Sequence, residues 1–116
     1  MAVLKSKLFA GDARLNACLV DNAKHVTLGD RGPHVSKIQS AVLMLDDGTI
    51  AGAELADRRY GPTTAKAVLR YKTRRQIINR SYQSKPDDIV GIMTIRTLDE
   101  EMVLSELRDS TARIRT

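Results

Sequence analysis

Two stretches of the sequence share one pattern: residues 60–68 read YGPTTAKAV, and residues 90–98 read VGIMTIRTL. In each, an apolar or aromatic residue is followed by Gly, two variable residues and Thr, and apolar residues then return at helical spacing. Gly allows the backbone to turn tightly without a Cβ clash, and a Thr hydroxyl in a first helical turn can bond a backbone group that lacks a partner. The pattern predicts two helices, each preceded by a tight turn. We call residues 60–64 and 90–94 the second and third initiating turns.

The first initiating turn lies upstream, at residues 26–33, where the sequence VTLGDRGP contains two glycines and a proline. Pro33 suits the first position of a helix, where its missing N–H is not needed. Behind it, apolar residues at helical spacing form one face: Val35, Ile38, Val42 and Leu45. This spacing predicts an amphipathic helix from residue 33 or 34 to residue 45, and Asp46-Asp47-Gly48 provides the turn residues that end it.

The predicted fold is all-α, a compact three-helix domain with a short extra N-terminal helix. The principal helices are expected near residues 33–45, 62–75 and 92–104, and the short helix near residues 12–19. Their apolar faces should meet in one core, built from Val35/Ile38/Val42/Leu45, Val68/Tyr71 and Ile95/Leu98/Met102.

The remaining segments connect or flank these helices. Residues 1–11 are expected to form an extended or frayed lead-in, and one short turn of helix is expected around residues 53–56. Residues 110–116 read as a basic, frayed tail. The chain is therefore divided into a leader at 1–24, a helical module at 25–104, and a helical extension or frayed tail at 105–116.

The composition is that of one small globular domain. The 116 residues fit a single core, 42% of them are hydrophobic, and aromatic residues are scarce. Cys18 lies in an apolar run and is expected to be buried filler, because a lone cysteine cannot form an internal disulfide. No apolar stretch is long enough for a membrane span, and residues 1–10 lack the apolar run of a signal peptide. We therefore expect synthesis in the cytoplasm.

The net charge of +5 favours acidic partners such as nucleic acid or anionic polymers. The basic residues gather in one part of the chain, at Arg58, Arg59, Arg70, Lys72, Arg74, Arg75 and Arg80. Two interpretations stay open at this point, a solvated helix face with its adjoining loop or an anion-binding strip.

Catalytic and metal chemistry has little support in the sequence. His25 and His34 are not spaced as zinc ligands, and the adjacent Asp87 and Asp88 are best explained as residues that cap a loop. No Ser, Cys or Lys nucleophile is accompanied by a recognisable base motif. We therefore predict a protein that is not an enzyme and that uses no metal and no cofactor.

The three initiating turns and the helices behind them resemble the peptidoglycan-binding-like domain. This family is a three-helix module appended to amidases, lysozymes, transpeptidases and matrix metalloprotease propeptides. The resemblance runs from about Val26 to Met102. The matching residues are Leu28, Gly29, Gly32, Val35, Ile38, Gln39, Tyr60, Gly61, Thr64, Ala67, Val68, Tyr71, Ile89, Val90, Gly91, Thr94 and Leu98. The resemblance implies a module that binds the bacterial cell wall.

The chain also departs from the family pattern. The connections at residues 46–60 and 76–88 are longer than in the family. Lys72 stands where the family has Gln, and Asp87-Asp88 stands where it often has Asp-Gly.

We predict that the ligand contacts the side formed by the connection at 46–60, the start of the second principal helix and the loop at 76–88. The candidate ligand-binding residues are Arg59, Tyr60, Tyr71, Arg80 and Tyr82. An aromatic face can pack on the C–H side of a sugar, and Arg can pair with the carboxylates of a stem peptide. For two of them another interpretation stays open, Tyr71 as half core and Tyr82 as the anchor of a solvated loop.

Three functions follow as hypotheses. The leading one is a non-catalytic module that binds the glycan or stem peptide of peptidoglycan. It would be part of, or loaded with, an effector or lytic enzyme that reaches the periplasm or cell wall without a signal peptide, as in phage lysis or type VI secretion. The alternative is a protein–protein adaptor for a secretion, phage-tail or toxin component. Specific nucleic-acid binding is the weakest, because no helix-turn-helix spacing is evident.

Overall fold

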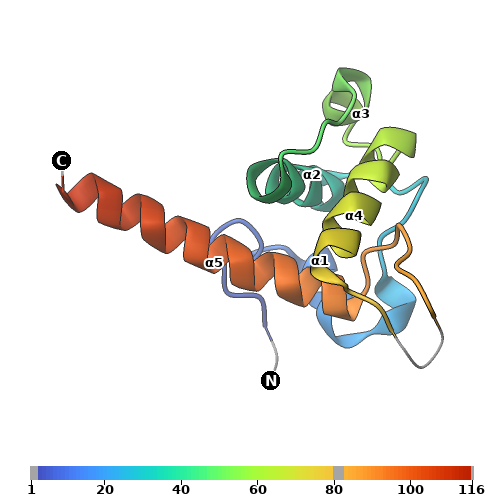
Figure 1. Cartoon of the computed structure of the whole chain (residues 1–116), viewed down its shortest axis with the longest axis horizontal. Coiled ribbons are helices and arrows are strands. Elements are labelled where there is room, and N and C mark those ends of the chain that lie inside the picture. Colours follow the sequence, from blue (N-terminus) through green and yellow to red (C-terminus); the bar gives the residue numbers. More distant parts are fainter. Residues whose placement is uncertain (1–2, 80–82, 116) are drawn as a thin grey trace.

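The chain folds into helices joined by turns, as the computed structural model shows for residues 3–79 and 83–115, with side chains up to Asp109 (Figure 1). Over these residues there is no β-strand, and the predicted all-α class is confirmed. The α-helices are α1 (Ala13–Val20), α2 (Pro33–Asp46), α3 (Gly52–Asp57), α4 (Pro62–Arg75) and α5 (Ile92–Arg115), and a 3₁₀ turn, η1, covers Asn22–Lys24.

The helix predictions are confirmed in position, with one difference in length. α1, α2, α3 and α4 lie where helices were expected, within about one residue at each end. α5 begins at Ile92 as predicted but continues to Arg115, so residues 105–115 extend the helix and the frayed tail expected from residue 110 was wrong. The physical reason is that no Gly or Pro follows residue 92 to end the helix.

Backbone hydrogen bonds hold the three initiating turns next to one another. Val26 and Val90 form an antiparallel bridge, with both N–H···O distances at 2.9 Å. The first turn also joins the second, because the N–H of Tyr60 donates to the carbonyl of Asp30 at 2.8 Å and the N–H of Gly29 donates to the carbonyl of Tyr60 at 2.9 Å. The starts of α2, α4 and α5 are therefore tied together.

Glycine is required by geometry in the first turn. Gly32 has φ of +136°, a backbone conformation that other residues rarely adopt. A Cβ there would also lie 3.2 Å from Nδ1 of His34. Gly32 thus sets the direction in which α2 leaves the turn.

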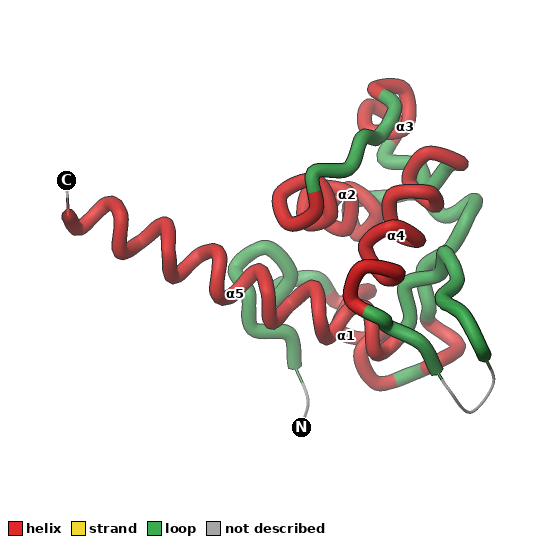
Figure 2. The backbone as a smooth tube through the Cα atoms, viewed as in Figure 1, coloured by secondary structure: helices red, strands yellow, loops and turns green. Residues whose placement is uncertain are grey.

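The predicted apolar faces do converge on one core. Figure 2 traces the backbone of the helices and of the loops that join them. α5 packs against α1 and α2, and α2 also packs against α4. All the predicted core residues of α2, α4 and α5 are buried except Leu45, which is partly buried and packs against the cluster. Cys18 is also buried, as expected for a cysteine that packs as a small hydrophobic residue, and burial raises the pKa of its thiol to about 11. No helix over the described residues is long and apolar enough to cross a membrane.

The segment before α1 is part of the core, so the frayed lead-in expected for residues 1–11 was wrong over the part that the structure describes. Leu4 and Phe9 are buried in the same cluster as the principal helices. The carboxylate of Asp99 on α5 accepts from the N–H of Lys5 at 2.9 Å and from that of Ser6 at 2.8 Å. Asp99 therefore fastens the leader to α5.

Candidate functional site

The two tyrosines predicted to bind ligand belong to the core. Tyr60 and Tyr71 are both fully buried. The Tyr60 hydroxyl donates to the carbonyl of Asp88, and the Tyr71 hydroxyl donates to Oε2 of Glu101 at 2.8 Å. Burial, helped by nearby carboxylates, raises the pKa of both hydroxyls well above the usual range. Both rings are therefore packed inside the core, and neither presents a face at the surface.

The other three candidate ligand-binding residues are Arg59, Arg80 and Tyr82. Arg59 is partly exposed, and its Nε lies 3.8 Å from Oδ2 of Asp57. Its carbonyl accepts a hydrogen bond from Nε2 of Gln39 at 3.0 Å, so its backbone has a structural role. Arg80 and Tyr82 lie outside the described residues, and their assignment stays a prediction.

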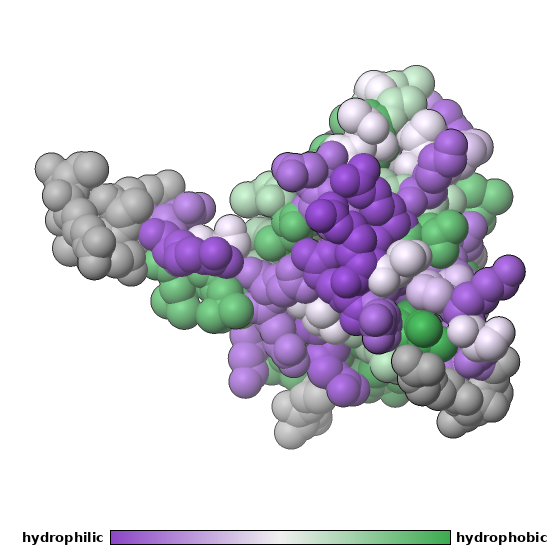
Figure 3. Space-filling model, in the orientation of Figure 1, coloured by the Kyte–Doolittle hydropathy of each residue, from purple (hydrophilic) through white to green (hydrophobic). Residues whose placement is uncertain are grey.

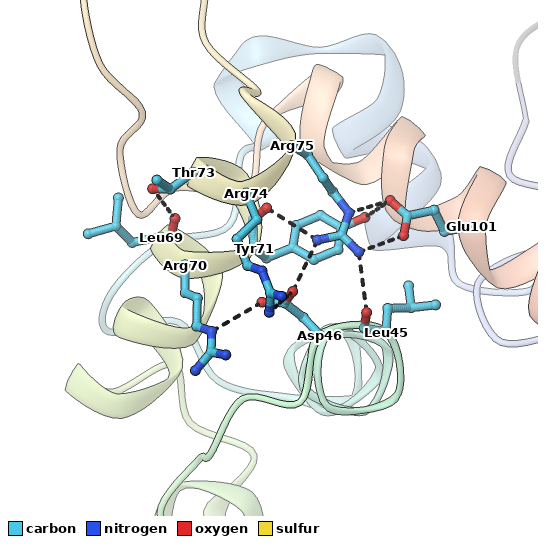
Figure 4. Close-up of polar contacts among 9 residues, drawn as sticks. All are labelled: Leu45, Asp46, Leu69, Arg70, Tyr71, Thr73, Arg74, Arg75 and Glu101. Carbon is cyan, nitrogen blue, oxygen red and sulfur yellow. Dashed lines mark hydrogen bonds and ion pairs between the residues drawn. The ribbon is translucent and has the colours of Figure 1, made fainter.

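Much of the basic strip is paired within the fold (Figure 4). Arg75 reaches Glu101 on α5 with Nε at 2.6 Å and Nη2 at 2.8 Å, and its Nη1 lies 3.2 Å from Oδ1 of Asp46 at the end of α2. Its guanidinium also stacks 3.8 Å from the ring centroid of Tyr71. Burial works to raise the pKa of Glu101, but hydrogen bonds from Arg75 and Tyr71 lower it overall. Arg75 therefore joins three helices and does not form a free anion site.

Two arginines of the strip are exposed on α4. Arg70 and Arg74 are 54% and 53% exposed, and both approach the buried carboxylate of Asp46. They lie on α4, where hydrophilic residues gather on the face seen in Figure 3. Both guanidinium groups therefore remain in contact with solvent while they pair with Asp46.

A pocket of about 290 Å³ lies where η1, the end of α4, residues 83–89 and the start of α5 come together. Its lining includes the apolar side chains of Ile77, Ile89, Ile92 and Met93. Polar groups are contributed by Asn22, His25, Lys72, Gln83 and Asp87. An apolar pocket with a few polar groups is the usual form of a ligand site.

One wall of the pocket contains the ion pair between Lys72 and Asp87. Lys72 is buried, and its Nζ lies 2.6 Å from Oδ1 of Asp87 and 2.7 Å from the carbonyl oxygen of Ile89. Asp87 also accepts from the N–H of Ile89 at 3.1 Å, which confirms its predicted role in capping the loop. Burial works to raise the pKa of Asp87, but the hydrogen bond from Lys72 and those from its neighbours lower it. The positive charge of Lys72 and the negative charge of Asp87 thus offset each other within the fold.

The second initiating turn binds a carboxylate from within the protein. Glu54 of α3 is buried and accepts from the N–H groups of Gly61, Thr63 and Thr64 at 2.9 to 3.1 Å. It also accepts from the Thr64 hydroxyl at 2.8 Å. Burial works to raise the pKa of Glu54, but these hydrogen bonds lower it to about 2. The start of α4 is therefore capped by Glu54, and the prediction that the Thr64 hydroxyl caps it was wrong.

The glycine of this turn is required by that carboxylate. A Cβ at Gly61 would lie 2.5 Å from Cδ of Glu54. Only Gly leaves room for the carboxylate to approach the amides.

The third initiating turn carries the same groups but faces the pocket. Gly91, Met93 and Thr94 correspond to Gly61, Thr63 and Thr64, and all three line the pocket. Within the part of the chain that the structure describes, no acceptor bonds their N–H groups or the Thr94 hydroxyl, although Thr94 is only 2% exposed. A Cβ at Gly91 would meet nothing within 4 Å and its φ is not positive, so the backbone role predicted for Gly91 has no support in the geometry.

Sequence reasoning missed Glu54, the Lys72–Asp87 pair and the donors of the third turn. The alignment of residues 60–68 with 90–98 could have indicated the donors of the third turn, because two turns with the same motif present the same backbone N–H groups and the same Thr hydroxyl. The acceptor Glu54 lies outside the motif and had no such signal. Among the described residues there is also no cluster of three or more His, Cys, Asp or Glu side chains that could hold a metal ion.

Comparison with known proteins gives no match to this chain from any family model, curated protein or solved structure.

Proposed function

We propose that this chain is a non-catalytic module that binds bacterial peptidoglycan in the pocket beside the start of α5. The single observation that carries the proposal is the position of this pocket. Residues 91–94, within the segment that resembles the family's third initiating turn, contribute part of its lining. On this proposal the protein acts at the cell wall or in the periplasm and targets an activity encoded elsewhere.

The composition of the pocket supports a small part of a polymer as ligand. Its volume of about 290 Å³ is near the lower end for ligand sites, which span roughly 300–1,000 Å³. The apolar side chains of Ile77 and Ile92 suit the methyl groups and C–H faces of wall material. Asn22 and Gln83 offer amides to peptide or sugar oxygens.

Retention on intact sacculi tests the proposal, with Met93→Ala compared with Met44→Ala. Both methionines are partly exposed, but only Met93 lines the pocket. We expect the wild type and Met44→Ala to be retained at about 0.3 M salt, where a charge of +5 is well screened. Met93→Ala should be retained several-fold less, with an unchanged melting temperature. Failure of the wild type to be retained at both low and high salt would overturn the proposal.

A second candidate is a protein–protein adaptor, favoured by the exposed apolar residues of α5. Leu104 and Leu107 are 57% and 59% exposed, and hydrophobic residues are visible where α5 leaves the body (Figure 3). An exposed apolar helix face is typical of surfaces that dock partners. A photo-crosslinking residue at position 104, compared with one at Leu28, tests it. A defined crosslinked partner obtained only at 104, together with no retention on sacculi, would favour the adaptor.

A further inference from the structure

The second initiating turn shows how this sequence motif binds a carboxylate. Three backbone N–H groups and one Thr hydroxyl surround the carboxylate of Glu54, with distances from 2.8 to 3.1 Å. Such a set of donors matches both oxygens of a carboxylate, and the helix dipole of α4 favours the negative charge. The chain thus contains an occupied example of the motif.

The third turn presents the same donors without an acceptor from the described residues. The N–H groups of Gly91, Met93 and Thr94 take the places of those of Gly61, Thr63 and Thr64. Thr94 supplies the hydroxyl. The residue is only 2% exposed and lines the pocket. Its hydroxyl has no partner among the described residues and is not one of the fully buried unpaired atoms of the fold, so it opens onto the pocket, where a ligand can reach it.

The electrostatics of the pocket are compatible with an anion. Lys72 and Asp87 lie 2.6 Å apart, so their charges offset each other. His25 is held at the rim by its contact with the carbonyl oxygen of Asn22, at 2.9 Å. What remains at the turn is the positive end of α5, a helix of 24 residues whose first three residues line the pocket.

We propose that the third initiating turn is a carboxylate-binding site that holds the free C-terminal carboxylate of a wall stem peptide. The donors are the N–H groups of Gly91, Met93 and Thr94 and the Thr94 hydroxyl. Ile77 and Ile89 line the same pocket and accept the small apolar side chain next to that carboxylate. The identity of the polymer rests on the proposed function, whereas the carboxylate rests on the match between the two turns.

A titration followed by amide NMR tests the site with a defined probe, N-acetyl-D-alanyl-D-alanine. Its C-terminal amide is the matched control, because it differs only in the charged group. We expect the acid to shift the amide resonances of Gly91, Met93 and Thr94, and the C-terminal amide to bind at least tenfold more weakly, since hydrogen bonds to a charged group are lost. Equal binding of the two probes, or no shift at these three residues, would overturn the carboxylate site.

The Thr hydroxyl is tested by Thr94→Val, which keeps the shape of the side chain. Thr97→Val is the matched control, because Thr97 lies about one turn further along α5, is outside the pocket lining, is only half-buried, and donates its hydroxyl to the carbonyl of Met93. We expect about tenfold weaker binding of the acid by Thr94→Val and unchanged binding by Thr97→Val. The wild-type titration decides the proposal even if Thr94→Val does not fold.

The outcomes separate this site from the proposed function. Retention on sacculi together with equal binding of acid and amide would overturn the carboxylate site alone. Shifts at the third turn without retention on sacculi would support a carboxylate site and overturn peptidoglycan as its source. A peptide ending in an L-residue that binds more tightly than the D-alanyl probe would then identify a protein C-terminus as the ligand, against the stem peptide proposed here.

Discussion

At the scale of single residues, the second and third initiating turns differ in one hydrogen-bond acceptor, Glu54, which only the second turn has. The motif at 60–64 closes on this carboxylate, and the motif at 90–94 opens on a pocket. Local sequence is therefore similar while the surroundings differ. The same Gly and Thr are structural in one turn and available for binding in the other.

Glu54 makes the stability of the fold depend on pH. Its pKa is about 2 in the folded chain against an ordinary 4.5. Because the folded state favours the charged form, this stabilisation is fully present above about pH 4.5 and is lost as the pH falls towards 2. Glu54→Gln should lower the free energy of unfolding at pH 7 by about 1–3 kcal/mol and reduce its pH dependence in this window. Urea unfolding at pH 7, 4 and 2.5 measures both, and an unchanged pH profile in the variant would contradict the assignment.

Gly61 and Gly91 should respond differently to the same substitution. Gly61→Ala places a Cβ 2.5 Å from the Glu54 carboxyl carbon, so the cap must move, at a cost of about 1–3 kcal/mol. Gly91→Ala meets nothing within 4 Å and should change stability by less than about 0.5 kcal/mol. Thermal unfolding of the two variants side by side is the measurement. Equal losses would show that Gly91 also has a structural role.

The residue scale is also where the sequence was least informative. Tyr60 and Tyr71 were expected at a ligand because aromatic side chains bind sugars, but burial depends on packing between distant segments. The Lys72–Asp87 pair was visible only as two separate departures from a family pattern. Three-dimensional contact, not residue type, decides which of these groups remain available.

At the scale of elements, the helices were predictable because their signals are local. Gly precedes α2 and α4, Pro is the first residue of each, and apolar residues follow at helical spacing, so both helices could be placed to within a residue. The leader was not predictable in the same way. Leu4 and Phe9 show no helical period, and the acceptor of the Lys5 N–H is Asp99, 94 residues further along the chain.

The attachment of the leader to α5 should depend on one carboxylate, that of Asp99. Asp99→Ala removes the acceptor of the Lys5 and Ser6 N–H groups, and the loss should be about 2 kcal/mol or more because these hydrogen bonds involve a charged group. The neighbouring Glu100 is exposed, and Glu100→Ala provides the matched control. Hydrogen exchange should accelerate at Lys5 and Ser6 in the first variant only. Protection that survives Asp99→Ala would mean that burial of Leu4 and Phe9 alone holds the leader.

At the scale of the whole molecule, one core is shared by segments that the sequence suggested were separate. Arg75 links α2, α4 and α5 through Asp46 and Glu101, and the leader closes over α5. The resemblance to a three-helix module covers residues from Val26 onward, yet part of the core comes from before it. Its residues from the leader are Leu4, Phe9, Leu15, Cys18 and Leu19.

A fragment that begins at residue 25 should therefore not fold cooperatively on its own. Burial of one large apolar side chain contributes roughly 1.5–3 kcal/mol, so Leu4, Phe9, Leu15 and Leu19 together contribute roughly 6–12 kcal/mol, comparable to the ~5–15 kcal/mol that stabilises a whole domain. We expect residues 25–116 to lack a cooperative unfolding transition, and a peptide of residues 1–24 to restore it when added in trans. A peptide carrying Phe9→Asp and Leu15→Asp is the matched control and should restore nothing, because unpaired charges would enter the core. Circular dichroism during urea titration follows all three samples. A cooperative transition of the fragment alone, with the midpoint of the full chain, would show that the leader is an accessory to an independent module.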